Sequence, residues 1–393
     1  MNGDYMNKEI QFIIFMFLAA SFLLIAYFCR NKSYIVQAGI ALCMLTVLLL
    51  AYSYRTLGMD WVNYRHEYDT TSLSDIAQRF RLKKIFSSQY EPLFNLMMYV
   101  AKLFGFTFPL FLILVYSIPI LVFGRAILGS DSPLTYFTVF FLLVMFNFDL
   151  TRAIVAIAFV YVAYHSKNRA WKLVFYLLAT GFHYSSFLAL ILECIVSFRK
   201  KKLYKPLILA GALLLVPLRF LNPKVLNYSR LSFISKVQYY LFHTETLDDP
   251  LLLNICYVLI NVFPIVFCFW LIIRFDAYFA PIRRNREDPA RYAFESDPSA
   301  LLRVEDEQED KDKHFLALCT IVSLVFLFIF GSIQGSFRIV FLSSFVVFTL
   351  FGKVLSANWS RKTIRFPGVS AVILLLLCNL WMSLYYVLAF YYY

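Results

Sequence analysis

The sequence has 393 residues, of which 61% are hydrophobic and only 16% charged, and its formal net charge is +13. A soluble domain of this size carries about 25% charged residues and few long apolar runs. The composition therefore excludes an ordinary soluble enzyme and predicts a polytopic membrane protein. On such a protein a positive charge is more typical of topology and contact with anionic lipid than of nucleic-acid binding, so we expect no nucleic-acid partner.

Apolar segments recur from one end of the chain to the other. Five are close to the ~20 residues with which a helix crosses a ~30 Å hydrocarbon core, namely 7–29, 34–54, 251–273, 315–330 and 369–390. Seven are weaker and shorter, and need polar ends or a thin membrane: 107–124, 134–147, 153–164, 173–180, 186–197, 204–216 and 339–351. Residues 92–104 are apolar but too short, which favours a re-entrant or interfacial helix. The sequence thus predicts an all-α bundle with about 12 crossings, as one integral membrane domain over residues 1–393.

The placement of lysine and arginine predicts the orientation of this bundle. With both termini outside, the inner connections hold 23 of the 37 basic residues, as the positive-inside rule favours. An outer loop then covers residues 54–91, and within it residues 72–85 are expected to form a short amphipathic helix on the membrane surface. A cytoplasmic loop covers residues 274–313 and ends in an acidic run at 305–312. We expect it to be a partly disordered, solvated linker, with a small regulatory role as the alternative.

Ionisable residues at the ends of apolar segments gather on the predicted outer side. Such groups are costly at membrane depth, so they usually face a cavity and mark function. Any one of them can instead be an interfacial side chain that reaches the lipid headgroups. The set consists of Arg55, Asp60, Glu91, Asp149, Arg152, His183, Arg219, Arg230 and Arg338.

The residue types in this set suit chemistry on phosphorylated sugars. Arginine presents a permanently charged fork to phosphate or pyrophosphate oxygens. Asp60, Glu91 or His183 can take a proton from a hydroxyl, although the carboxylates can equally pair with the arginines. Neighbouring aromatic residues, Tyr64 among them, can stack on sugar rings or simply pack. No HExxH motif and no glycine-rich phosphate loop with a lysine occurs, and the seven cysteines lack metal-ligand spacing, so we expect neither metal nor cofactor.

Five short motifs occur in a fixed order along the chain. They are R-x-x-G-x-D-x-x-x-Y at 55–64, Y-E-P-L-F at 90–94, F-D-L-T-R-A-I-V-A at 148–156, F-H-Y-S at 182–185 and F-R at 337–338. This order resembles the EpsG branch of the Wzy-type polysaccharide polymerases, over about residues 50–340. The chain departs from the family pattern at Val155, Ala156 and Pro92. None of these three changes removes an ionisable group.

The resemblance implies a GT-C-like, metal-independent glycosyltransferase. Such an enzyme polymerises undecaprenyl-pyrophosphate-linked oligosaccharide units into O-antigen, capsule or exopolysaccharide at the outer (periplasmic or exterior) face of the bacterial cytoplasmic (inner) membrane. Its partners are the lipid-linked donor and acceptor, membrane lipid, and a chain-length regulator and flippase of the same pathway. The candidate catalytic residues are Asp60, His183 and Glu91. The candidate residues for binding pyrophosphate or glycan are Arg55, Tyr64, Asp149, Arg152, Arg230 and Arg338.

Two alternative functions stay open at this point. A transporter or flippase of lipid-linked oligosaccharide would place buried charges near the membrane centre and show related halves. Here the charges gather at one predicted surface, and no duplication is visible. Another outer-face transferase, either an O-antigen ligase or a sugar acyltransferase, would use the same arginines or depend on His183.

Overall fold

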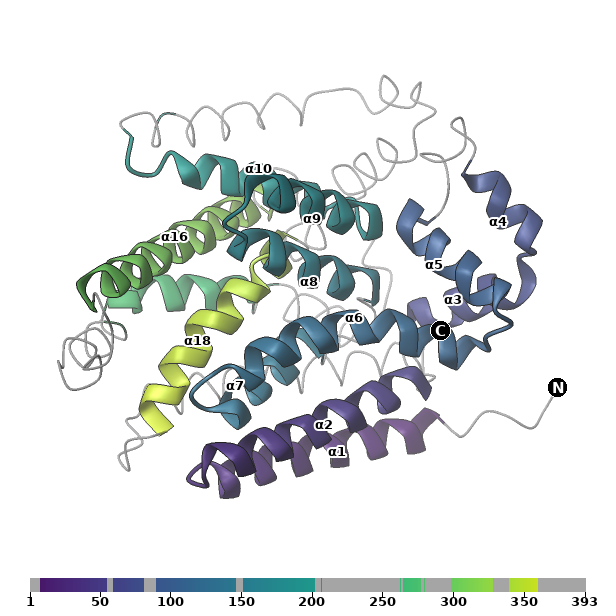
Figure 1. The fold of residues 1–393 in the computed structure, drawn as a ribbon, viewed down its shortest axis with the longest axis horizontal. Coiled ribbons are helices and arrows are strands. Elements are labelled where there is room, and N and C mark those ends of the chain that lie inside the picture. Colours follow the sequence, from purple (N-terminus) through teal and green to yellow (C-terminus); the bar gives the residue numbers. More distant parts are fainter. Residues whose placement is uncertain are drawn as a thin grey trace. The chain divides into compact units, whose positions relative to one another are not determined.

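The computed structural model describes residues 8–54, 59–80, 90–145, 151–201, 264–276, 298–327 and 339–359, with isolated positions 206, 262 and 279. Within these ranges every regular element is a helix and no strand occurs, which confirms the all-α prediction for this part of the chain (Figure 1). The described helices fall into two compact units. The first contains α1 to α9, and the second contains α16, α18 and most of α10.

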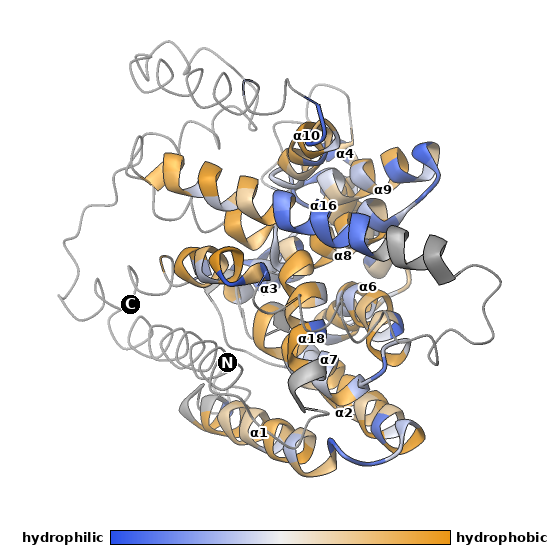
Figure 2. Ribbon diagram, turned by 90° about the vertical axis from the view of Figure 1, so that its left-hand side faces the viewer, coloured by the Kyte–Doolittle hydropathy of each residue, from blue (hydrophilic) through white to orange (hydrophobic). Residues whose placement is uncertain are grey.

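Four apolar helices, three of them long and one short, form one side of the first unit. They are α1 (Lys8–Cys29), α2 (Tyr34–Tyr54), α6 (Phe108–Leu128) and α7 (Pro133–Phe140). These helices pack on one another, and α1, α2 and α6 are mostly hydrophobic along their length (Figure 2). In α2, Ala41 and Leu48 are fully buried while Ile35 is 80% exposed. A helix with apolar side chains on all faces is typical of a membrane span, because its outer face contacts lipid.

Three short helices carry the chain between α2 and α6: α3 (Met59–Thr70), α4 (Leu73–Arg79) and α5 (Pro92–Leu103). At the start of α4, Ser72 and Asp75 form a capping box. The helix predicted at 72–85 is therefore present but ends at Arg79, and residues 81–89 lie outside the described part. The short helix predicted at 92–104 is confirmed as α5, whose 12 residues are too few to cross a membrane. Its re-entrant or interfacial placement stays a prediction.

After α7 the chain forms a π-helix (Phe141–Met145) and then α8 (Thr151–His165), α9 (Arg169–Phe182) and α10 (Ser186–Ser197). The helices α8 and α9 pack closely along their length. The side chain of Asn168 caps α9 by accepting from the backbone of Ala170 and Trp171. Only residues 183–185 separate α9 from α10, so this break is a tight turn rather than a loop.

The second unit contains α16 (Pro298–Val325) and α18 (Ser344–Trp359), which pack on each other. The expectation of a partly disordered linker up to residue 313 is wrong for residues 298–313, because they form the first half of α16. Figure 2 shows the part of this half that it colours, residues 306–313, as mostly hydrophilic. Glu309 is fully buried and Asp312 is 3% exposed, so the acidic run is not simply solvated. Composition predicted a linker because it reveals the charged residues of this stretch but not the residues elsewhere in the chain with which they pair.

Two of the described helices, α2 and α6, are long and apolar enough to cross a membrane. Shorter apolar helices lie at Ile13–Cys29, Pro133–Leu143, Thr151–His165, Ser186–Ser197, Pro264–Ile273 and Ser344–Ser356. The predicted segments 204–216 and 369–390 lie outside the described residues. The number of about 12 crossings and the orientation of the bundle therefore stay predictions.

Candidate functional site

Glu91 stands at the N-terminus of α5 with its side chain buried. Pro92 occupies the first helical position and holds Glu91 in an extended conformation, with φ −65° and ψ 153°. The Glu91 carboxylate makes no hydrogen bond that caps its own helix. It is directed instead to Arg152 and His183, and its side chain is only 2% exposed. A buried carboxylate is costly unless it is paired, and the contacts with Arg152 and His183 offset this cost.

Arg152 is the second residue of α8, where the helix dipole disfavours a cation. The start of this helix is fixed by a buried hydrogen bond of 2.7 Å between the hydroxyls of Thr151 and Tyr116. The guanidinium then reaches two partners. Its Nη1 donates to Glu91 Oε2, and its Nε donates to the hydroxyl of Tyr64 over 2.9 Å. Glu91 thus compensates the unfavourable position of Arg152, whose side chain keeps 17% of its surface exposed.

His183 comes to Glu91 from the end of α9. Its backbone is extended, with φ −155° and ψ 113°, and its N–H donates to the carbonyl of Ala179. Its Nδ1 lies 3.4 Å from Glu91 Oε1. The approach of α9 to α5 depends on Gly181, because a Cβ there would lie 2.6 Å from Cδ1 of Leu93. Gly181 therefore allows α9 and the Leu93 side chain of α5 to lie close together, two residues before His183.

Two tyrosine rings flank the Arg152 guanidinium. Its central carbon lies 5.5 Å from the centre of the Tyr64 ring and 5.2 Å from that of Tyr90, within the range of cation–π attraction. Both rings also pack on Phe94, and each tyrosine is only 3% exposed. Little of the Tyr64 ring is therefore accessible to a sugar. Its visible contribution is to hold Arg152, and its role in glycan binding stays a prediction.

Tyr184 follows His183 in the turn before α10. Burial and the charge of Glu91 raise the pKa of its hydroxyl to about 12, against a smaller lowering by Arg152. The phenol is therefore protonated at any physiological pH. It adds a neutral hydroxyl, and no further charge, beside the carboxylate.

The structure brings together four of the predicted site residues, which we call the site cluster: Tyr64, Glu91, Arg152 and His183. Asp60 lies in the first turn of α3, but its side chain lies outside the described part. Arg55, Asp149, Arg230 and Arg338 also lie outside the described residues. The catalytic and binding roles of all these residues stay predictions.

Sequence reasoning did not identify Asn95 or Arg79 as residues around the site. Asn95 could have been noticed as a polar residue one helical turn after Glu91 in an apolar helix. Nothing in the sequence connects Arg79 to the site, because its contacts are made across helices.

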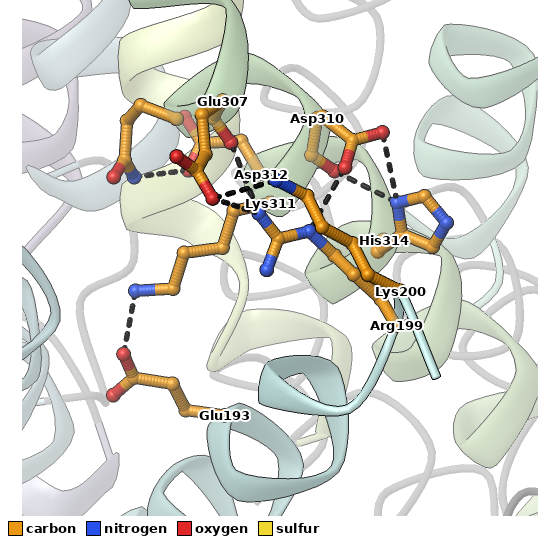
Figure 3. Close-up of polar contacts among 9 residues, drawn as sticks. Glu193, Arg199, Lys200, Glu307, Asp310, Lys311, Asp312 and His314 are labelled. Atoms are coloured by element: carbon orange, nitrogen blue, oxygen red, sulfur yellow. Dashed lines mark hydrogen bonds and ion pairs between the residues drawn. The ribbon is translucent and has the colours of Figure 1, made fainter. Parts of the chain in front are cut away.

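A second group of charges, the α10–α16 cluster, lies within the second unit (Figure 3). It joins the end of α10 to the first half of α16 through several ion pairs, and Glu307 is shared by Lys200 and Arg199. These ion pairs include Arg199 with Asp310 at 2.8 Å, Lys200 with Glu307 at 2.9 Å and Lys311 with Glu193 at 2.5 Å. The hydrogen bond and charge of Lys200 lower the pKa of Glu307. This cluster holds two helices together and has the character of a structural contact.

The site cluster combines a titratable imidazole, a buried carboxylate and a permanent cation. Such a set can take a proton from a hydroxyl and stabilise a negatively charged leaving group. Among the described residues, no group of three or more His, Cys, Asp or Glu side chains is arranged to hold a metal ion.

Comparison with known proteins identifies the family. The family model named EpsG family matches residues 38–393. The chain belongs to the EpsG family. EpsG proteins are exopolysaccharide and Wzy-like polymerases, so the resemblance seen in the motifs is confirmed. The EpsG match and the apolar helices together indicate a membrane protein of exopolysaccharide biosynthesis. No curated protein and no solved structure matched the chain.

Proposed function

We propose that this EpsG-family protein polymerises undecaprenyl-pyrophosphate-linked oligosaccharide units at the outer face of the cytoplasmic membrane. The observation that carries the proposal is the site cluster itself. Glu91, Arg152 and His183 come from three separate segments and converge at the ends of three helices. In a polymerase family, a buried group of this composition is the best-supported candidate for the reacting centre. The proposal includes the GT-C-like bundle of about 12 crossings.

The proposed reaction is a glycosyl transfer. A hydroxyl oxygen of the acceptor glycan forms a bond to the anomeric carbon of the donor glycan. The bond from that carbon to the pyrophosphate oxygen breaks, and its electron pair leaves with undecaprenyl pyrophosphate. The acceptor's hydroxyl proton passes to a base. Permanent cations stabilise the charge that develops on the leaving pyrophosphate, and arginine can do this without a metal ion.

His183 is the base we favour, with Asp60 as the alternative. A carboxylate facing Nδ1 favours the tautomer that carries its proton there, so Nε2 is the basic nitrogen. Glu91 then orients the imidazole and stabilises the imidazolium that forms. Arg152 is the cation we place nearest the pyrophosphate. Its bond to Tyr64 fixes the plane of the guanidinium.

The remaining predicted residues complete the proposal. Arg55, Arg230 and Arg338 would add cations for the two pyrophosphates, and Asp149 with Tyr64 would contact the glycan. The donor, the acceptor and membrane lipid are the direct partners, with a chain-length regulator and a flippase acting in the same pathway.

The experiment expresses Glu91→Gln, Arg152→Gln and His183→Ala in a strain deleted for the gene and separates the surface glycan on a gel. We expect the ladder of chain lengths to disappear and a single capped repeat to remain. Arg65→Gln is the matched control, because Arg65 pairs with Asp69 on the exposed side of α3 and we expect a normal ladder.

Other outcomes separate the alternatives. Loss of all surface glycan, with lipid-linked single units trapped inside, would identify a flippase. Polymer that accumulates on its lipid carrier without reaching its final acceptor would identify a ligase. Normal ladders from all three site variants would overturn the proposed site.

A further inference from the structure

A second polar group in the first unit is formed by Arg79, Glu67 and Asn95. It approaches Glu91 through the backbone of α5 rather than through the Glu91 carboxylate. Arg79, the last residue of α4, donates from Nη2 to Glu67 and from Nη1 to Oδ1 of Asn95, the latter over 3.2 Å. Glu67 also accepts from the hydroxyl of Thr71 over 2.8 Å. One guanidinium therefore connects α3, α4 and α5.

Asn95 transmits this connection to the backbone on both sides of Glu91. Its side-chain Nδ2 donates to the carbonyl of Tyr90 over 2.8 Å, and its backbone N–H donates to the carbonyl of Glu91 over 3.1 Å. The residue is 1% exposed. With Pro92 restricting the following bond, these contacts fix both peptide groups that determine where the Glu91 carboxylate points.

Arg79 favours one of the two orientations of the Asn95 side-chain amide. The guanidinium has only donors, so it requires the amide oxygen on its side. The amide NH₂ is then directed to the Tyr90 carbonyl. Without Arg79, a rotated amide would place its oxygen against that carbonyl and lose the hydrogen bond. The orientation of a buried amide thus depends on a residue of α4.

From these contacts, we infer that Arg79 and Asn95 are positioning residues for Glu91, and through Glu91 for Arg152 and His183. The inference deepens the proposed function and rests on it. The bond from Arg79 to Asn95 attaches α4 to α5, on which α4 packs. The same bond reaches the residue that holds the backbone at Glu91.

The test is a double-mutant cycle between Arg79→Met and Glu91→Asp in the deletion strain. Glu91→Asp keeps the charge but draws the carboxylate back, so it is expected to leave measurable polymer. Polymer is measured by densitometry of the ladder and divided by the amount of protein in the membrane, determined by immunoblot. We expect Arg79→Met alone to lower polymer per protein roughly tenfold, within the range of couplings between contacting residues.

In the Glu91→Asp background we expect Arg79→Met to have almost no further effect, because the position of the carboxylate is already lost. Losses that multiply would overturn the inference and leave the proposed function standing. A normal ladder from Glu91→Gln would overturn the proposed site and this inference together. Arg65→Met is the control arginine and should leave the ladder unchanged in either background.

A second variant covers the case in which Arg79→Met fails to accumulate. Asn95→Asp keeps an oxygen for Arg79 but lacks the donor to the Tyr90 carbonyl. We expect it to accumulate and still lose polymer to the same degree as Glu91→Asp. Full polymer from Asn95→Asp would overturn the inference, because the hydrogen bond to the Tyr90 carbonyl would then be dispensable.

Discussion

The protein contains two charged clusters that differ in how the charges are shared. In the site cluster one buried carboxylate, Glu91, serves both Arg152 and His183, and no side chain of this trio is more than 17% exposed. In the α10–α16 cluster the charges are spread over several carboxylates: Arg199 contacts both Glu307 and Asp310, and Lys200 contacts Glu307 as well. The side chains of Glu307 and Asp310 are 59% and 43% exposed. Ion pairs that are spread over several carboxylates, most of them partly hydrated, fasten helices. A shared, buried carboxylate is sensitive to any anion that approaches its cation, which is what a pyrophosphate substrate would do.

The largest expected difference is between lysine substitutions of one arginine from each cluster. Arg152→Lys removes the fork that reaches Glu91 and Tyr64 together, so we expect polymer per protein to fall about 10²- to 10³-fold. Arg199→Lys also loses a fork, toward Asp310 and the Glu307 carbonyl, but should reduce only the stability of the protein. The ladder assay and thermal unfolding of the purified protein in detergent measure the two effects. Equal losses of polymer from Arg152→Lys and Arg199→Lys would show that the two clusters do not differ in their importance for polymerisation.

A smaller effect is expected from Gly181→Ala, which leaves every charge in place. The added methyl would lie 2.6 Å from Leu93 and push α9 away from α5. We expect roughly a tenfold loss of polymer, because general base catalysis depends on the distance between Glu91 and His183. Gly39→Ala is the matched control, since nothing lies within 4 Å of a Cβ at that position. If both variants polymerise normally, the contact between α9 and α5 does not set the geometry of the site.

The smallest effect concerns Lys200→Met in the α10–α16 cluster. Exposed ion pairs contribute at most about 1 kcal/mol, so we expect a shift in thermal unfolding of only a few degrees or less. The pKa of Glu307 is lowered by Lys200, so this contribution is present at neutral pH and is lost as the pH falls through the lowered pKa. Unfolding curves of the wild type and Lys200→Met should therefore differ at pH 7 and converge at acidic pH. A difference that grows on acidification would contradict this assignment.

The fold was most predictable where apolar runs end at polar residues. The bounds predicted at 34–54 and 186–197 are those of α2 and α10. The first half of α16 was mispredicted because its charged residues were read as solvated, whereas Glu309 of α16 pairs with Lys353 and Lys311 of α16 pairs with Glu193 of α10. These partners are 44 and 118 residues apart, a separation that no local pattern encodes.

The sequence predicted the four residues of the site cluster, but it did not predict the contacts between them. Glu91, Arg152 and His183 could be assigned to one side because each follows or precedes an apolar segment on the same predicted face. The sharing of Glu91 by the other two could not be predicted, because it depends on Gly181 allowing α9 to approach α5. The involvement of Arg79 depends on the amide orientation of Asn95, which only the folded chain defines.

The length of α16 has a mechanical consequence. Its 28 residues extend for about 42 Å at 1.5 Å per residue, and the stretch before Phe315 accounts for about 25 Å of this. On the predicted topology, residues 315–330 cross the membrane and the charged stretch lies outside the hydrocarbon, so α16 would be a stiff rod with one charged arm and one apolar arm. A force or a binding event at the charged arm would therefore be transmitted into the bilayer without a hinge, and tilting one end of α16 would tilt the other.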